Sequence, residues 1–174
     1  NAGESPTLTV NGRSFVLTSD IINELLEVIH KKTPEVVKNP FVRAPYGKQY
    51  YYIDNYGQVD DIVEAAQEID DKYYSNVNYF QNESIAQQVA LHQLLYRKLL
   101  KFTYDNDCVD TAKWDGHGNH WFIYYNCDAK EYQAAVTFVV HQFSTAYFST
   151  KEAAEQAIDE VVKPFMKKHP EFVW

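Results

Sequence analysis

The densest group of side chains that could carry chemistry lies between Cys108 and Asp128. Its members are the usual metal ligands and proton carriers: Cys108, Asp110, Asp115, His117, His120, Cys127 and Asp128. The pair His117-x-x-His120 could supply two ligands to zinc. Asp115, His117 and Asp128 could instead hold a harder metal for phosphodiester hydrolysis. Neither cysteine has a C-x-x-C partner, so the spacing of a zinc finger is absent.

This segment allows two interpretations. A metal-dependent nuclease would draw its ligands from one set of four residues, Asp115, His117, His120 and Asp128. The favoured interpretation is a polar loop, because Asp, Asn, Gly and His are ordinary turn residues. We therefore expect no bound metal and no other cofactor.

Other catalytic motifs are missing from the sequence. The only G-x-G is Gly116-His117-Gly118, which lacks the third glycine and the helix of a dinucleotide site. Neither a G-x-S-x-G motif nor a cysteine-protease signature is present. His141 follows an apolar stretch and is interpreted as a structural histidine. These observations favour a non-enzymatic protein.

A run of acidic residues extends from Asp54 to Asp71 with no Lys or Arg in it. It consists of Asp54, Asp60, Asp61, Glu64, Glu68, Asp70 and Asp71. One interpretation is a solvated strand face and turn, since surfaces are normally charged. The other is an anionic patch that attracts a basic protein partner.

Charge and aromatic content bear on nucleic-acid and membrane binding. Lys and Arg number 16 against 24 Asp and Glu, a net charge of −8, whereas proteins that neutralise phosphates are usually basic. Bases could still stack on exposed strand aromatics, for which the candidates are Tyr50, Tyr52, Tyr73, Tyr74, Trp121 and Tyr125. Nucleic acid is thus a less favoured partner. No apolar run approaches the roughly 20 residues of a membrane span.

The first part of the chain predicts a β-hairpin and a helix over residues 1–33. Leu8–Val10 and Arg13–Leu17 flank Asn11-Gly12, a pair typical of type I′ turns. An apolar stripe from Ile21 predicts the helix, which Thr33-Pro34 should end. Residues 34–48 contain three prolines and are interpreted as a linker.

Two similar units follow, over residues 49–106 and 121–174, separated by a polar loop at 107–120. Tyr79–Val89 can be laid over Tyr147–Ala157 at an offset of 68 positions. Each copy starts a helix, capped by Asn82 in the first and by a Ser149–Glu152 capping box in the second. Upstream of each helix we expect an aromatic strand (50–54, 121–125), then a second strand (58–65, 132–140) and a third, at 76–80 in the first copy, so that each copy is a β-β-β-α unit. The fold class is therefore α+β, with antiparallel sheets packed on helices.

The two helices should carry the core. The first has a stripe of Ile85, Val89, Leu91, Leu94, Leu95, Leu99 and Leu100, and the second of Ala154, Ala157, Ile158, Val161, Val162 and Phe165. Pro164 is expected to kink or end the second helix. Two cysteines do not make a disulfide framework, so both are expected to be reduced.

Residues 48–170 resemble an uncharacterised group of proteins from phages, prophages and other mobile elements of Gram-positive bacteria. The likeness rests on an aromatic strand with a glycine turn (Tyr50–Gly57), a Tyr/Asn-rich segment ending in Phe80, a Trp-led strand (Trp121–Tyr125) and a helix start at Phe148–Glu155. This sequence departs from the group at Asn82-Glu83-Ser84, where Thr-Lys-Glu is usual. The resemblance implies an accessory protein of a mobile element, and carries no activity with it.

These observations together lead us to expect a non-enzymatic binding protein whose acidic run engages a basic protein. Inhibition of a host nucleic-acid-handling or defence enzyme is one role of this kind. We expect a monomer or small homo-oligomer in a bacterial cytoplasm, away from membranes, since the N-terminal residues lack a signal-peptide pattern. The alternatives are the metal-dependent nuclease and single-stranded nucleic-acid binding by strand aromatics.

Overall fold

The computed structural model of the chain describes residues 7–10, 13–16, 18, 20 and 39–174. The chain divides into two compact units, residues 1–40 and 41–174. In the first unit, β1 (Thr7–Val10) pairs with antiparallel β2 (Arg13–Val16), which confirms the predicted strand pairing. The predicted Asn11-Gly12 turn and the helix up to residue 33 lie outside the described residues.

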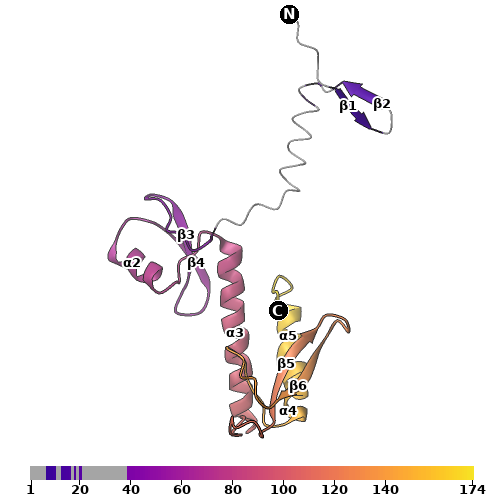
Figure 1. Ribbon diagram of the computed structural model, residues 1–174. Coiled ribbons are helices and arrows are strands. Elements are labelled where there is room, and N and C mark those ends of the chain that lie inside the picture. Colours follow the sequence, from indigo (N-terminus) through magenta and orange to yellow (C-terminus); the bar gives the residue numbers. More distant parts are fainter. Residues whose placement is uncertain (1–6, 11–12, 17, 19, 21–38) are drawn as a thin grey trace, which may run out of the picture. The chain divides into compact units, whose positions relative to one another are not determined.

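The second unit combines helices with two small antiparallel sheets, as the α+β prediction requires (Figure 1). Its first half contains β3 (Gln49–Ile53), β4 (Val59–Val63), α2 (Glu68–Ser75) and α3 (Glu83–Asp105). Its second half contains β5 (His120–Asn126), β6 (Glu131–Thr137), α4 (Lys151–Ala157), the π-helical turn η1 (Ile158–Val162) and α5 (Lys163–Lys168).

In both sheets of this unit the first strand of the hairpin makes a further bridge, and Phe148 in the later one also bridges Val109. β3 pairs with β4, and Tyr51 in β3 also bridges Phe80. β5 pairs with β6, and Trp121 in β5 also bridges Phe148. The third strand expected at 76–80 is thus reduced to a single bridge at Phe80.

The second strand of the later hairpin is shorter than predicted. β6 ends at Thr137, whereas the prediction continued to Val140. The Thr137 hydroxyl accepts a hydrogen bond from the Val140 backbone N–H (3.1 Å) and folds the chain into a turn. His141 consequently follows a turn and is exposed to solvent.

Helix α2 was not predicted, and it contains much of the acidic run. Gln67 and Asp70 form a reciprocal capping box at its start, and Glu68 and Asp71 complete an acidic first turn. Such a turn is stabilised by the positive end of the helix dipole. Part of the presumed strand face and turn is therefore a helix.

The caps and the proline of the longer helices correspond only in part to the prediction. Asn82 caps α3 by accepting from the Ile85 N–H, as expected (3.0 Å). Helix α4 is capped by Thr150 and not by Ser149. Pro164 lies in the first turn of α5, directly after η1. The chain stays helical past it, and the turn directly before the proline is π-helical, with the Lys163 N–H bonded to the Ile158 carbonyl.

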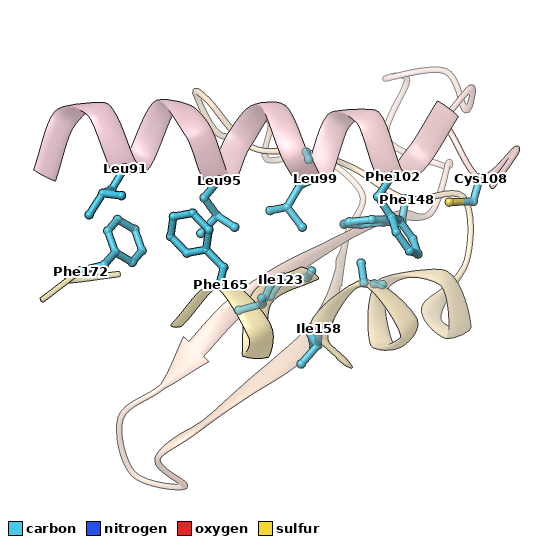
Figure 2. Close-up of a cluster of buried hydrophobic side chains, with 14 residues drawn as sticks. Leu91, Leu95, Leu99, Phe102, Cys108, Ile123, Phe148, Ile158, Phe165 and Phe172 are labelled. Atoms are coloured by element: carbon cyan, nitrogen blue, oxygen red, sulfur yellow. The ribbon is translucent and has the colours of Figure 1, made fainter. Parts of the chain in front are cut away.

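The main core lies between α3 and the second half of the unit. Leu91, Leu95, Leu99 and Phe102 project from one side of α3 toward the aromatic and aliphatic side chains below it (Figure 2). Those side chains include Ile123, Phe148, Ile158, Phe165 and Phe172. Leu100, predicted in the same stripe, is exposed because it lies about 100° around the helix from Leu99.

Replacement of Phe148 tests this core. Its side chain is fully buried and its backbone joins β5. We expect Phe148→Ala to lower the free energy of unfolding by about 3–5 kcal/mol in urea titrations. Phe143→Ala is the matched control: Phe143 is 98% exposed, so a change within about 0.5 kcal/mol is expected. Equal effects of the two substitutions would contradict this core.

Candidate functional site: an acidic hairpin and a buried histidine

The acidic run does not form one continuous surface patch. Glu64 is only 2% exposed and Asp70 only 1%, and both hydrogen-bond to groups inside the fold. Asp71 is exposed but forms an ion pair with Arg43 (2.7 Å). The prediction of a surface patch is therefore wrong for Glu64 and Asp70, which are buried. Asp71 stays at the surface with Arg43 as its cationic partner.

Glu64 is held by donors from three parts of the chain. Arg43 donates to both of its carboxylate oxygens, from Nε at 3.0 Å and from Nη2 at 2.9 Å. The Tyr79 hydroxyl (2.9 Å) and the Ala66 N–H (2.8 Å) also donate to it. The Arg43 guanidinium and these donors keep the pKa of Glu64 below its ordinary value despite burial.

Asp70 has no direct cationic partner and is held by neutral donors. Burial alone would raise its pKa, but three hydrogen bonds outweigh burial and lower it. They come from the Gln67 N–H (2.9 Å), the Tyr50 hydroxyl (2.7 Å) and the Ala65 N–H (3.0 Å). Asp70 thereby joins the start of α2 to β3.

The two tyrosines whose hydroxyls donate to these carboxylates pack against each other. The Tyr50 and Tyr79 rings are stacked with centroids 3.8 Å apart. Burial, together with the neighbouring carboxylates, raises the pKa of Tyr50 and raises that of Tyr79 to about 12. Both hydroxyls therefore remain protonated donors near neutral pH.

The proposed base-stacking aromatics are mostly engaged with one another. Tyr50 is buried, Tyr52 stacks on Tyr73 (4.4 Å), and Tyr74 meets Tyr79 edge to face. Tyr73 and Tyr74 lie in α2 and not in a strand. Trp121 is half-buried against the core and Tyr125 packs on Tyr132. The six candidates therefore do not lie on one strand platform.

The remaining acidic residues lie on the outside of the same segment. Asp54 accepts from the Tyr56 and Gln58 N–H groups in the β3–β4 turn. Glu68 pairs with Lys72 along α2. Asp60 and Asp61 in β4 are exposed, and neither forms an ion pair within the described part of the chain. Asp60 accepts only from neutral groups, the Tyr52 hydroxyl (3.3 Å) and the Asp61 N–H (2.8 Å). Among the exposed acids of the run, these two are therefore the ones without a cationic partner in the described residues.

The later candidate loop contains a buried histidine. His120 is completely buried, and its Nδ1 lies 2.6 Å from Asp110 Oδ2. The Trp114 ring stacks on the imidazole with centroids 3.4 Å apart. Nε2 faces the chain near Gly118, where an added Cβ would lie 3.2 Å from it, and has no hydrogen-bond partner. A substrate would have to displace Trp114 or this loop to reach Nε2.

The other proposed metal ligands do not join His120. Asp115 accepts from the backbone N–H of His117 in an exposed turn, and Asp128 lies exposed in the β5–β6 turn. No group of three or more His, Cys, Asp or Glu is placed to hold a metal among the residues the structure describes. Cys108 is buried, Cys127 is exposed, and both are free.

Two residues that organise these sites escaped the sequence analysis. Arg43 falls in the presumed linker, and nothing in its local sequence points to Glu64. Asp110 belongs to the group of possible ligands between Cys108 and Asp128, but its sequence position does not connect it with His120. His120 stands directly before the predicted strand at 121–125, and an acid ten positions earlier in a polar loop is not a signal that links the two residues.

Comparisons with known proteins place no constraint on this site. No known family, no curated protein and no solved structure matches the chain. Among the described residues, no helix has both the length and the apolar character needed to cross a bilayer.

Replacing Glu64 should change how stability depends on pH. Because the pKa of Glu64 is lowered from its ordinary 4.5 in the folded state, its contribution is present above that value and is lost as pH falls through the folded pKa. Glu64→Gln should therefore be less stable than wild type near neutral pH, and the gap should narrow in acid. Urea titrations between acid and neutral pH measure this difference in unfolding free energy, with Glu68→Gln as the exposed control. A gap that is constant with pH would contradict the assignment.

The Asp110–His120 pair predicts a second stability effect. Asp110→Ala leaves the buried Nδ1 without its partner, so we expect a loss of about 1–3 kcal/mol in unfolding free energy. Asp115→Ala removes an exposed carboxylate from the same loop and should change it by about 0.5 kcal/mol or less. Thermal or urea unfolding separates the two. Equal losses of unfolding free energy in the two variants would contradict a stabilising role of the Asp110–His120 pair.

Proposed function

We propose that this protein is a non-enzymatic binding protein that engages a basic protein partner through the β3–β4 hairpin. The observation that carries the proposal is the division of the acidic run. Glu64 and Asp70 are buried and Asp71 pairs with Arg43, whereas Asp60 and Asp61 are exposed and form no ion pair in the described chain. Exposed acidic groups of this kind attract a basic surface and speed its encounter.

The hairpin also has an aromatic contact residue. Tyr56 lies in the turn next to the acidic strand and is 88% exposed. Tyrosine is enriched in protein interfaces, because its ring buries a large area while its hydroxyl remains hydrogen-bonded. A partner with cationic groups around an apolar pocket would fit this combination.

The internal carboxylates contribute to the proposal by holding the hairpin in place. Tyr50 in β3 is tied to Asp70 in α2, and Glu64 just after β4 is tied to Arg43 and Tyr79. A hairpin fixed at its base loses little conformational entropy when a partner binds, which favours affinity. The binding surface is thus organised before the partner arrives.

The setting we propose is a mobile genetic element acting in a bacterial cytoplasm. It rests on the sequence resemblance described above. A protein of this setting with an acidic binding surface suits the inhibition of a host enzyme that handles nucleic acids, because such enzymes present basic surfaces to their substrates. The partner would then be the basic face of that enzyme.

The metal-dependent nuclease and the nucleic-acid-binding alternatives receive less support. His120 is buried apart from Asp115, His117 and Asp128. The candidate strand aromatics pack largely on one another. Neither alternative has a specific observation in its favour.

An affinity capture from nuclease-treated bacterial lysate, quantified by mass spectrometry, tests the proposal. The wild-type protein should retain a basic protein, and Asp60→Asn/Asp61→Asn should lose most of it. Asparagine keeps the size of each side chain and removes its charge. At position 60 its one oxygen can still accept from the Asp61 N–H (2.8 Å), whereas the longer contact from the Tyr52 hydroxyl (3.3 Å) loses its acceptor. Glu64 is kept unchanged, because its replacement would perturb the fold.

Glu83→Gln/Glu152→Gln is the matched control. It removes two negative charges from exposed positions that have no ion pair in the described chain. Capture should survive in this variant and should weaken with salt in the wild type. Equal capture by the Asp60/Asp61 variant and the wild type would refute the proposal.

A further inference from the structure

Strand β6 is an unprotected sheet edge. Its sequence from Glu131 to Thr137 is EYQAAVT, with no charged residue and no proline after Glu131. The sheet contains only β5 and β6, so one side of β6 has no neighbouring strand in the described chain. Natural proteins usually protect such an edge with charges, proline or a bulge.

The hydrogen bonds of β5 show which groups of β6 point outward. Trp121 exchanges both of its backbone hydrogen bonds with Phe148 (3.3 and 2.8 Å), so they point away from β6. Val136, which lies opposite Trp121, is therefore in a non-hydrogen-bonded pair. By alternation, the N–H and C=O groups of Tyr132, Ala134 and Val136 all point away from β5.

The other hairpin protects the equivalent edge. Tyr51 exchanges its bonds with Phe80 (2.7 and 2.8 Å), so the backbone of Asp61, opposite Tyr51, points outward from β4. Asp60 Oδ1 accepts from this Asp61 N–H at 2.8 Å. The outer edge of β4 thus carries two carboxylates and an amide that already has a hydrogen-bond acceptor. Strand β6 has neither a carboxylate after Glu131 nor such an amide in the described chain. The same chain protects one edge and leaves the other open.

We propose that β6 pairs with β6 of a second copy of this chain, antiparallel and about a two-fold axis at Ala134. This register aligns the whole strand, with Tyr132 opposite Val136 of the second copy. The outward groups of Tyr132, Ala134 and Val136 on both copies are then satisfied together. The two hairpins become one four-stranded sheet in the order β5, β6, β6, β5.

Charge distribution favours a second copy as the occupant. Glu131 lies opposite Thr137 of the second copy, so no like charges face each other. The two Glu131 residues lie at opposite ends of the paired strands, about 20 Å apart, beyond the screening length at physiological salt. Lys151 and Glu155 line a hollow beside Tyr132–Ala134 but pair with each other (2.9 Å), so a basic or acidic strand would find no unpaired counter-charge there.

Sedimentation and amide hydrogen exchange, both followed against protein concentration, test this pairing. The protein should pass from monomer to dimer as concentration rises. Exchange at the amides of Tyr132, Ala134 and Val136 should slow over the same range. The amides of Gln133 and Ala135 already bond to β5 and should not change.

Ala134→Pro provides a second test. It removes one outward N–H and no bond to β5, and edge strands tolerate proline. The variant should remain monomeric at concentrations where the wild type is dimeric, with its circular dichroism unchanged. If the variant does not fold, the concentration dependence of amide hydrogen exchange in the wild type still tests the pairing.

Three results would overturn the pairing. The first is a wild-type monomer at every concentration. The second is a dimer in which the amides of Tyr132, Ala134 and Val136 exchange as in the monomer. The third is a folded Ala134→Pro variant that dimerises like the wild type.

Discussion

Burying two carboxylates requires that each be fully satisfied, and the first half of this fold is organised around that requirement. Glu64 and Asp70 receive donors from Arg43, from Tyr50 and Tyr79, and from the backbone of residues 65–67. The Tyr79 hydroxyl also accepts from the Ala44 N–H (3.0 Å). A lost donor would leave a buried charge underpaired, which is costly. The segment from 43 to 79 is therefore tied together by polar contacts as much as by apolar ones.

Helix α3 relates these polar contacts to the apolar second half. Its early part contacts β3 and β4, and further along the leucine stripe meets the hydrophobic cluster around Phe148 (Figure 2). In both halves a phenylalanine bridges an aromatic strand just before a helix begins. In the first half, however, Tyr50 and Tyr79 bond to carboxylates, whereas apolar contacts dominate in the second. Similar sequence segments thus form two different interiors, one with carboxylate hydrogen bonds and one that is mainly apolar.

The sequence predicted those parts of the fold that depend on interactions between residues close together in the chain. The first hairpin, the aromatic strands, the Asn82 cap and most of the helix stripes depend on neighbouring residues, and they were correct. The burial of Glu64 and Asp70 depends on Arg43 and Tyr50, which are distant in sequence. A run of acids without local cations is typical of a surface, so the prediction placed them there. Helix α2 was missed for a related reason, because Tyr73 and Tyr74 favour strands in isolation.

The proposed function depends on the division of one acidic run into carboxylates that fold the chain and carboxylates that face a partner. An NMR titration that follows the side-chain carboxyl carbons of Glu64 and Asp70 tests this division directly. The account predicts that both titrate below their ordinary values, and that the signals of Tyr50 and Tyr79 shift with them. Ordinary or raised values for Glu64 and Asp70 would place them in solvent or without donors, and would contradict the account.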